Sequence, residues 1–440
     1  MKYRVYTFGG INTKVSPILH QAGELTRSVN VDSYHYGSLK KRQGYTTYLG
    51  TADGSAVNDL WNWTFQSGTQ MFNYRYSGNL IYYSTQGTGV WTICGNGTVS
   101  GTVNQIGHAT LGSTMIIGDG VGLSKYSTDG TSFTNIAAAP SVPYFEEYNQ
   151  RIYAGGTSNT LYYSALGTPS NWTPGTATTD SNSFQIPGAG NINKLFKTNN
   201  RLVIGQNSGR LHKWDGYTLS QVPSDKGIGS PRSLGELEDN FMYLNNLGFY
   251  AFNGDKPRIM SNHIEKLVYN DAGNGISGAA FGTAPGGVHL YDYYCQVGTV
   301  TDDNGDVINN CVVKYNYQLD EWRTYSYSDK PNCFLSYKDA TGARKMIFGS
   351  DGGQCYTLGG NSDNGKPIIA VVEGILNFGS PETDKKFNSI KVQASPGCSV
   401  KVQVAISDTY ESSRKNWIDI GDLHSGVIDK NFPAGSRGKL

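Results

Sequence analysis

Histidines and cysteines are the side chains of this sequence most able to bind a metal or act in catalysis. The seven histidines are scattered, and none lies four residues from another, the spacing that places two ligands on one helical face. His212 precedes Asp215 by three residues, which puts the two side chains on opposite faces of a strand. The six cysteines form no C-x-x-C pair and have no nearby histidine, so we expect buried, reduced thiols. These patterns predict neither a metal nor a cofactor.

Acidic residues gather at two turn-forming stretches. Asp129 lies in Ser127-Thr-Asp-Gly-Thr-Ser-Phe133, which is similar to the Asp-box turn of sialidases but lacks one residue of that pattern and does not recur. Asp302-Asp-Asn-Gly-Asp306 omits the alternate oxygen ligands and the distal glutamate of a calcium loop. Asp-Gly and Asn-Gly pairs favour tight hairpins, so both stretches are interpreted as turns. With no nucleophile elbow or phosphate loop either, we predict that the protein is not an enzyme.

Two basic runs remain as candidate interaction segments. Lys40-Lys41-Arg42 is the only run of three basic residues, and Lys385-Lys386 is a second, shorter one. Such runs meet phosphate groups or an acidic partner, although a solvated strand end explains the first run as well. The candidate interaction residues are therefore Lys40, Lys41, Arg42, Lys385 and Lys386.

The composition indicates which elements carry these residues. The chain has 440 residues with 56 Gly and 30 Tyr, and only 16% are charged, which is typical of many short strands joined by tight turns. Lys and Arg number 36 against 35 Asp and Glu, so the net charge of +1 does not steer the protein toward nucleic acid. No apolar signal or spanning segment is visible, so we expect a soluble protein made in a cytoplasm.

A degenerate repeat runs through the middle of the chain. Each copy has a strand, a Gly or Asn turn, and a second strand that opens with aromatic or Leu residues. Gly118, Gly155, Gly205 and Asn245 are equivalent positions in successive copies. The steps between them are close to the roughly 40 to 50 residues of a four-stranded β-propeller blade. With one earlier copy and two weaker later ones, we predict an all-β, irregular propeller of about seven blades, with six as the alternative.

The flanks of the repeat differ from it. Residues 1–50 are predicted to form an arm whose strand, residues 39–48, closes the propeller, because an unpaired edge invites aggregation. Residues 51–360 form the propeller itself. Residues 361–440 are predicted to form an appended β-sandwich-like domain with strands at 368–376, 387–394 and 399–406. No strand is expected in residues 432–440, so this end is either a tail or a domain that lacks its last strand.

Several motifs, in order along nearly the whole chain, resemble the tail-hub propellers of tailed bacteriophages, a family also called packaged-DNA stabilisation protein or head-to-tail adaptor. The motifs are rich in Gly, Asn and Tyr. They are Gly9-Gly10-Ile-Asn12, Arg27-Ser-Val-Asn-Val-Asp32, Gly37-Ser-Leu-Lys-Lys-Arg-Gln-Gly-Tyr45, Tyr162-Tyr-Ser-Ala-Leu-Gly-Thr-Pro-Ser-Asn-Trp172, Lys226-Gly-Ile-Gly229, Asn245-Asn-Leu-Gly-Phe-Tyr-Ala-Phe-Asn-Gly254, Ser261-Asn-His-Ile-Glu-Lys266 and Leu376-Asn-Phe-Gly-Ser-Pro-Glu-Thr-Asp-Lys-Lys386.

The resemblance implies a structural virion protein of the head-to-tail connection, a tail hub or nozzle. It implies a homo-oligomeric ring, expected to be a hexamer, that extends the portal channel and retains packaged double-stranded DNA. The expected partners are the portal or adaptor protein on one side and other tail components on the other, without membrane insertion. The protein would be located in the virion tail. A receptor- or glycan-binding propeller at the tail tip is the alternative, and a propeller glycosidase is disfavoured because blade loops lack paired acids.

Overall fold

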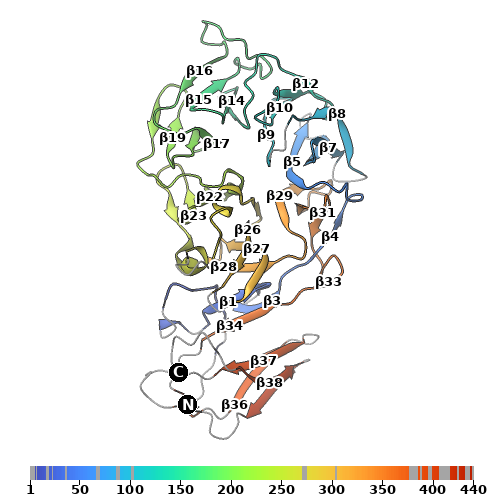
Figure 1. Cartoon of the computed structure of the whole chain (residues 1–440), viewed down its shortest axis with the longest axis vertical. Coiled ribbons are helices and arrows are strands. Elements are labelled where there is room, and N and C mark those ends of the chain that lie inside the picture. Colours follow the sequence, from blue (N-terminus) through green and yellow to red (C-terminus); the bar gives the residue numbers. More distant parts are fainter. Residues whose placement is uncertain are drawn as a thin grey trace.

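Each copy of the sequence repeat folds as an antiparallel sheet, and seven such sheets stand around a common centre as the blades of a β-propeller (Figure 1). The seven-blade prediction is therefore confirmed and the six-blade alternative is not. The computed structural model describes residues 5, 7–15, 19–21, 23–34, 37–65, 70–85, 90–100, 104–269, 275–302, 305–375, 385–386, 389–394, 399–405, 417–423, 426–431 and 437–438.

Blades 1 to 5 are each built from four consecutive strands. Blade 1 contains β5 (Val57–Phe65), β6 (Gln70–Ser77), β7 (Leu80–Thr85) and β8 (Thr92–Thr98). Blade 2 contains β9 (Gly107–Leu111), β10 (Thr114–Gly118), β11 (Lys125–Ser127) and β12 (Thr134–Asn135). Blade 3 contains β13 (Tyr144–Tyr148), β14 (Arg151–Gly155), β15 (Thr160–Tyr163) and β16 (Asn182–Gln185). Blade 4 contains β17 (Ile192–Thr198), β18 (Arg201–Gln206), β19 (Leu211–Trp214) and β20 (Leu219–Gln221). Blade 5 contains β21 (Gly235–Leu237), β22 (Asn240–Asn245), β23 (Gly248–Phe252) and β24 (Arg258–Ile259).

Tight turns join the first two strands of blades 2 to 5. In blades 3 and 4 the two turn residues are Asn149-Gln150 and Asn199-Asn200, and all four have positive φ, between 47° and 59°. This is the type I′ geometry whose twist matches that of paired strands, and Asn tolerates it well. The turn residues that punctuate the repeat therefore set the hairpin register.

The helical elements whose bounds are fully described are short and lie between blades. None has the length and hydropathy that crossing a bilayer requires. They are η3 (Pro231–Ser233), η4 (Ser261–Ile264), α1 (Glu265–Val268) and α2 (Ala280–Thr283).

Blades 6 and 7 contain strands from the two flanks of the chain as well as their own. Blade 6 has β25 (Gly286–His289), β26 (Asp292–Thr301), β27 (Val307–Asn316) and β28 (Glu321–Ser326), followed by β1 (Leu25–Val29) and β34 (Val371–Gly374). Blade 7 has β29 (Pro331–Lys338), β30 (Arg344–Ser350) and β31 (Cys355–Leu358), followed by β4 (Tyr45–Tyr48), β32 (Ser362–Asp363) and β33 (Lys366–Pro367). A separate hairpin pairs β2 (Val31–Tyr34) with β3 (Ser38–Lys41).

The expected boundary at residue 360 is therefore wrong. Residues 362–367 belong to the sheet of blade 7, and the strand predicted at 368–376 appears as β34, which pairs with β1 instead of joining the C-terminal strands. The physical reason is that the outermost strands of blades 6 and 7 leave edges, and these segments cover them.

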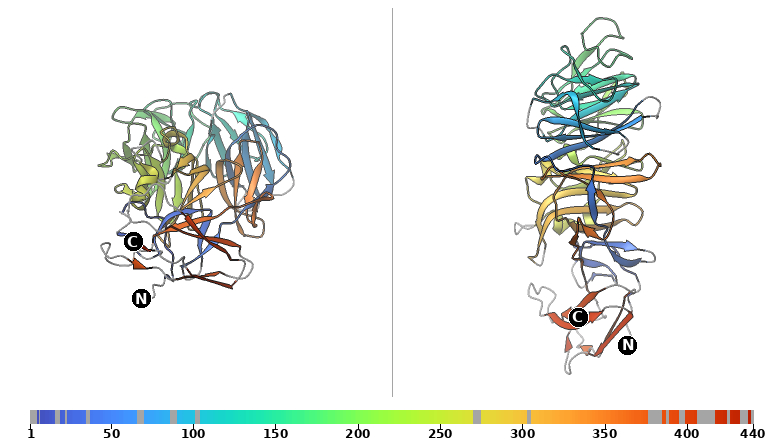
Figure 2. Two further views of the ribbon diagram at one scale, coloured as in Figure 1. Left: turned by 60° about the horizontal axis from the view of Figure 1, so that its bottom comes forward. Right: turned by 90° about the vertical axis from the view of Figure 1, so that its right-hand side faces the viewer.

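The C-terminal strands form three antiparallel pairs, and two of these pairs share a small core that contains Val402 and Ile420. The expectation of no strand in residues 432–440 is wrong, because 437–438 pair with 385–386. These strands lie on one side of the propeller, beside β1 and β34 (Figures 1 and 2). The pairs are β35 (Lys385–Lys386) with β40 (Arg437–Gly438), β36 (Ser389–Ala394) with β39 (Gly426–Asn431), and β37 (Val400–Ala405) with β38 (Trp417–Leu423).

The apolar core follows the blades, with one buried cluster at each contact between neighbours. Between blades 2 and 3, Ile116 packs in one cluster with Phe145 and Ile152. At the closing contact between blades 7 and 1, Ile347 shares a cluster with Val57. Seven clusters for seven contacts mean that the ring closes on itself through hydrophobic burial.

Candidate functional site

The N-terminal segment completes the propeller. Strand β4 pairs antiparallel with β31 in register from Tyr45↔Leu358 to Tyr48↔Cys355, which makes it the fourth strand of blade 7. The predicted closure is confirmed for residues 45–48, whereas residues 39–41 belong to β3. The backbone at Gly44 passes very close to the backbone at Ser362. A Cβ atom at position 44 would lie only 1.9 Å from the carbonyl oxygen of Ser362. Only glycine fits at this crossing.

Arg42 locks this closure from within. Its side chain is 2% exposed, and its guanidinium forms a two-pronged ion pair with Asp363, with N···O distances of 2.8 and 2.7 Å. It also donates to Asn30 Oδ1 at 2.7 Å and to the carbonyl oxygen of Ser326 at 2.8 Å. The sequence predicts a solvated strand end for this basic run, or contact with phosphate groups or an acidic partner. The solvated strand end is wrong for Arg42, because its side chain is buried and its hydrogen bonds join three distant segments of the chain.

Two further buried cations fasten the same segment. Lys314 of β27 lies 2.8 Å from Asp32 of β2 and 2.9 Å from Asp292 of β26. Burial lowers the pKa of Lys314, but the neighbouring Tyr294, Asp32 and Asp292 more than offset this and raise it. Arg323 of β28 binds Glu321 at 3.0 Å and the hydroxyl groups of Ser28 and Ser33. We call Arg42, Lys314 and Arg323, with these partners, the N-terminal lock.

The other basic candidates lie elsewhere. Lys40 and Lys41 are exposed on β3. The Lys40 ammonium lies 4.7 Å from the ring centre of Tyr34, and Lys41 donates to the carbonyl oxygen of Asn361 at 3.0 Å. Lys385 and Lys386 form β35. The structure describes their backbone but not their side chains. The structure therefore leaves Lys40 and Lys41 as the exposed members of the first basic run.

The acidic stretch around Asp129 acts as a turn, as predicted, whereas residues 303–304 at the centre of the second stretch lie outside the described residues. Asp129 accepts hydrogen bonds from the amides of Thr131 and Ser132, both at 2.8 Å. Slight burial raises its pKa, but these bonds and that of the Ser132 hydroxyl outweigh burial and lower the pKa to about 2. Asp302 and Asp306 form an ion pair with Arg27, at 2.8 and 2.6 Å.

The histidine and cysteine candidates also have structural surroundings. His212 hydrogen-bonds Gln206 at 3.1 Å, whereas Asp215 accepts from the amides of Tyr217 and Thr218. Cys398 lies outside the described residues, and the other five cysteines are buried and free, as expected. Among the described residues, no three His, Cys, Asp or Glu side chains are grouped to hold a metal.

A charged cluster that the sequence reasoning missed lies at the centre of the propeller. Its members come from the first strands of blades 1 to 4 and from η3 beside blade 5. Asp59 and Lys194 belong to blades 1 and 4, which are not neighbours, yet each shifts the pKa of the other, so the two groups lie within electrostatic range across the ring. We call the set the central cluster: Asp59, His108, Glu146, Lys194 and Arg232.

Local contacts fix several of these side chains. Asp59 accepts from the amides of Leu60 and Ile106, both at 2.9 Å, which ties blade 1 to the start of blade 2. The His108 ring stacks on Trp61, with ring centres 5.4 Å apart. Arg232 donates to the carbonyl oxygen of Asn58 at 2.6 Å and to that of Asn332.

The central position shifts the pKa of each titratable member. Burial among the first strands raises the pKa of Asp59 to about 6, although Arg232 opposes the shift. Burial likewise raises the pKa of Glu146 to about 7, although Lys197 opposes it. For the bases, loss of hydration beside the neighbouring strands lowers the pKa of His108, although part of its side chain stays exposed to solvent, and lowers that of Lys194 by an amount that Asp59 and Glu146 reduce. Shifts of this kind mark functional sites and also structural ion networks.

The cluster has a signal in the sequence, but a weak one. Asp59, His108, Glu146 and Lys194 follow one another at intervals close to the blade repeat of roughly 40 to 50 residues. A search for one charged residue per repeat, at the start of each first strand, would have found them. Local motif searches do not, because the residues become neighbours only when the ring closes.

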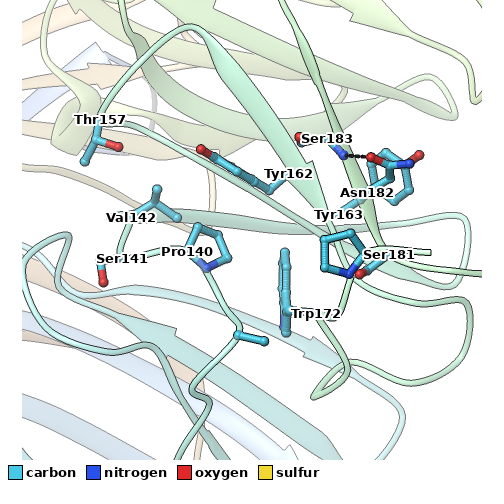
Figure 3. Close-up of a pocket in the computed structure, with 12 residues that line it drawn as sticks. Pro140, Ser141, Val142, Thr157, Tyr162, Tyr163, Trp172, Ser181, Asn182 and Ser183 are labelled. Carbon is cyan, nitrogen blue, oxygen red and sulfur yellow. Dashed lines mark hydrogen bonds between the residues drawn. The ribbon is translucent and has the colours of Figure 1, made fainter.

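A hollow of about 280 Å³ lies between blades 2 and 3 (Figure 3). Aromatic and proline side chains meet hydroxyl and amide groups there, and no charged side chain of the described residues lines it. The lining residues labelled in Figure 3 are Pro140, Ser141, Val142, Thr157, Tyr162, Tyr163, Trp172, Ser181, Asn182 and Ser183.

Comparison with known proteins finds similarity in structure alone. No protein-family model and no curated protein sequence matches the chain. Among solved structures, YCF48 bound to D1 peptide is 10% identical over 74% of this chain and 99% of that chain, with a TM-score of 0.45. BamB from Moraxella catarrhalis is 12% identical over 75% and 89%, with a TM-score of 0.40. PorZ of Porphyromonas gingivalis is 12% identical over 86% of this chain and 46% of that chain, with a TM-score of 0.44. The propeller assignment itself rests on the strand pairing described above.

Proposed function

We propose that the chain is a structural subunit of the head-to-tail connection of a tailed bacteriophage, a tail hub or nozzle. In this role, copies form a ring that extends the portal channel and retains packaged DNA. The family resemblance of the motifs suggests the role, and hexameric symmetry comes from that resemblance. The geometry adds one supporting observation, which concerns the two flanks of the chain.

That observation is the double pairing of β1. This strand pairs parallel with β28 of blade 6 at Val29↔Thr324 and antiparallel with β34, from Leu25↔Gly374 to Val29↔Val371. A continuous sheet therefore runs from the propeller through both flanks, toward the side on which the C-terminal strands lie (Figure 2). A subunit that holds two neighbouring components of the particle at a fixed distance needs such a rigid connection between its propeller and its flanking segments.

The side of the molecule that holds these flanks also offers contact surface. Strand β34 is the last strand of its sheet in the described part of the chain. Val372 in this strand is 40% exposed, and Ile369 just before it is 75% exposed. Exposed apolar side chains beside a sheet edge favour contacts with another protein. The charges of Lys40 and Lys41 would set the orientation of such a contact more than its affinity.

A glycan- or receptor-binding propeller at the tail tip is the second candidate. The hollow between blades 2 and 3 favours it, because aromatic rings and hydroxyl groups gather there without charge among the described residues. The acids that a glycosidase could use, Asp129 and Asp302, are held by turn amides and by Arg27, respectively.

Position in the particle separates the two candidates. Virions labelled with an antibody against this protein should show label at the junction of head and tail by negative-stain microscopy. Label confined to the distal tip would contradict the hub role and support the tip role. Virions of an unrelated phage with the same antibody are the control for non-specific label.

A further inference from the structure

The connection between the last two strands of blade 3 is much longer than its counterparts. It occupies residues 164–181, whereas the same connection occupies only 128–133 in blade 2, 215–218 in blade 4 and 253–257 in blade 5. A plain hairpin needs no more than the shorter lengths. Loops beyond about 12–15 residues inside a compact domain usually carry function.

This long loop is ordered by its own polar contacts. Arg151 donates to the carbonyl oxygens of Ser164 and Asp180, at 2.6 and 2.8 Å, and also to that of Thr178. The Asp180 carboxylate accepts from the amide of Ala177 at 2.8 Å, and the indole N–H of Trp172 donates to the carbonyl oxygen of Pro169 at 2.8 Å. The loop is thus held in one shape before any ligand arrives, which lowers the entropic cost of binding.

The loop forms one wall of the hollow between blades 2 and 3. It contributes Trp172, Pro174 and Ser181, and the facing wall includes Pro140 and Val142 from the connection between the blades. Figure 3 shows the rings of Tyr162, Pro140 and Trp172 around one open space, with Ser181 and Ser183 at its border. Flat apolar faces alternate with hydroxyl groups around this space.

The side chain of Ser181 gives independent evidence for a ligand in the hollow. Its side chain is 1% exposed, and its hydroxyl group has no hydrogen-bond partner among the residues that the structure describes. A buried hydroxyl without a partner is costly, so native proteins rarely keep one without a reason. Ser181 lines the hollow, so a turn of its side chain about the Cα–Cβ bond would bring the hydroxyl group to a ligand hydroxyl there and supply the missing partner.

We infer that the hollow between blades 2 and 3 is a binding site for a neutral saccharide of one or two rings. Its volume of about 280 Å³ lies at the lower end of small-molecule pockets and excludes a long ligand from full burial. The apolar face of a sugar ring packs on Tyr162, while its hydroxyl groups meet Ser181 and the side chains beside it. The uncharged lining selects against phosphorylated or acidic sugars.

A proline-rich peptide is the main competing ligand, because aromatic grooves bind such peptides as well. Recognition of that kind needs side-chain N–H or O–H donors for the peptide carbonyls. The indole N–H of Trp172 is already bound to Pro169, which removes the strongest such donor. The chemistry therefore favours the saccharide. The inference does not depend on whether the protein is a hub or a tip component.

The test is saturation-transfer NMR on the purified full-length chain with neutral hexoses, N-acetylhexosamines and their disaccharides. We expect the wild-type protein to transfer saturation to the ring protons of a neutral sugar at millimolar concentration. The Tyr162→Ala variant should bind the same sugar with at least tenfold weaker affinity. Tyr217→Ala is the matched control, because Tyr217 is 93% exposed on blade 4 and should bind as the wild type does.

Ser181→Ala separates a binding role from a structural one. Removing a buried hydroxyl that lacks a partner should keep or raise the melting temperature, yet weaken sugar binding severalfold. A fall in melting temperature with unchanged binding would overturn the inference. So would the absence of transfer to every neutral sugar, equal transfer with Tyr162→Ala, or binding of a proline-rich peptide in place of the sugars.

Discussion

Blades 1 to 5 and the N-terminal segment are held in the propeller by different forces. The repeated blades join through apolar clusters such as that of Leu161 and Leu202, in which every partner lies within one or two repeats of the chain. The N-terminal segment joins such clusters through Tyr45 and Tyr48, and it adds buried ion pairs that span hundreds of residues, as between Arg42 and Asp363. Hydrophobic burial is non-directional and suits a repeat, whereas a charge pair is costly unless its exact partner is present. The difference teaches that stacking of blades and closure of the ring are specified separately.

Removal of residues 1–48 should have the largest effect. The deletion takes away β4, the N-terminal lock and Tyr45, whose fully buried ring lies 5.0 Å from that of Phe348. The edge of β31 would then be unpaired, which promotes aggregation, and the Asp363 carboxylate would lose its partner. We expect insoluble or protease-sensitive protein on expression and limited proteolysis. A truncated chain that stays monomeric with an unchanged melting temperature would contradict the closure.

Arg42→Ala should destabilise the protein by about 3–5 kcal/mol, because it leaves Asp363 buried without its partner. Urea unfolding measures this loss. The double variant Arg42→Met with Asp363→Leu should recover much of it, since replacing both charges removes the uncompensated one. Lys40→Ala, two residues away but exposed, should change stability by less than about 0.5 kcal/mol. Equal effects of Arg42→Ala and Lys40→Ala would refute the lock.

Glu146→Gln should have a smaller effect, with a direction that depends on pH. Folding raises the pKa of Glu146 from 4.5 to about 7, so the folded state binds its proton more tightly. Its contribution to stability is therefore present below pH 4.5 and is lost as pH rises toward 7. The variant should match the wild type in acid and be more stable by about 1–2 kcal/mol above pH 7, after allowance for solvent screening.

Thermal unfolding from pH 5 to pH 8 tests this difference, and comparison with the wild type at each pH removes the opposing titration of His108. Glu147→Gln is the matched control, because Glu147 is paired with Lys197 at 2.7 Å and should gain no stability. A Glu146→Gln variant that is less stable than the wild type at pH 8 would show that its charge is needed in the central cluster.

The fold was predictable to the extent that it is periodic. Gly118 and Gly155 end the second strands of blades 2 and 3, so the spacing of turn residues carried the blade count. The closing role of residues 45–48 followed from the need to cover an edge. The partner of β1 was not predictable, because a four-residue strand such as β34 looks alike whether it pairs with β1 or with its sequence neighbours.

The sites were predictable only where chemistry is local. Asp129 is correctly predicted as a turn residue, because its partners lie within three positions. The prediction for Arg42 is wrong, because its basic neighbours suggest exposure and its partner Asp363 follows far along the chain. The central cluster and the hollow were missed for the same reason. Glu146 and Lys194 become neighbours only through blade stacking, and the length of the loop that holds Ser181 has meaning only beside the other blades.

Mass photometry of the purified chain, with and without the connector that precedes it in the particle, tests the central claim most directly. The propeller buries its own core, so the chain alone should be monomeric or weakly associated. On the connector, which presents several sites at once and raises the effective concentration, it should form a closed ring with the six copies that the family resemblance implies. A one-to-one complex that never reaches a closed ring would contradict the hub role.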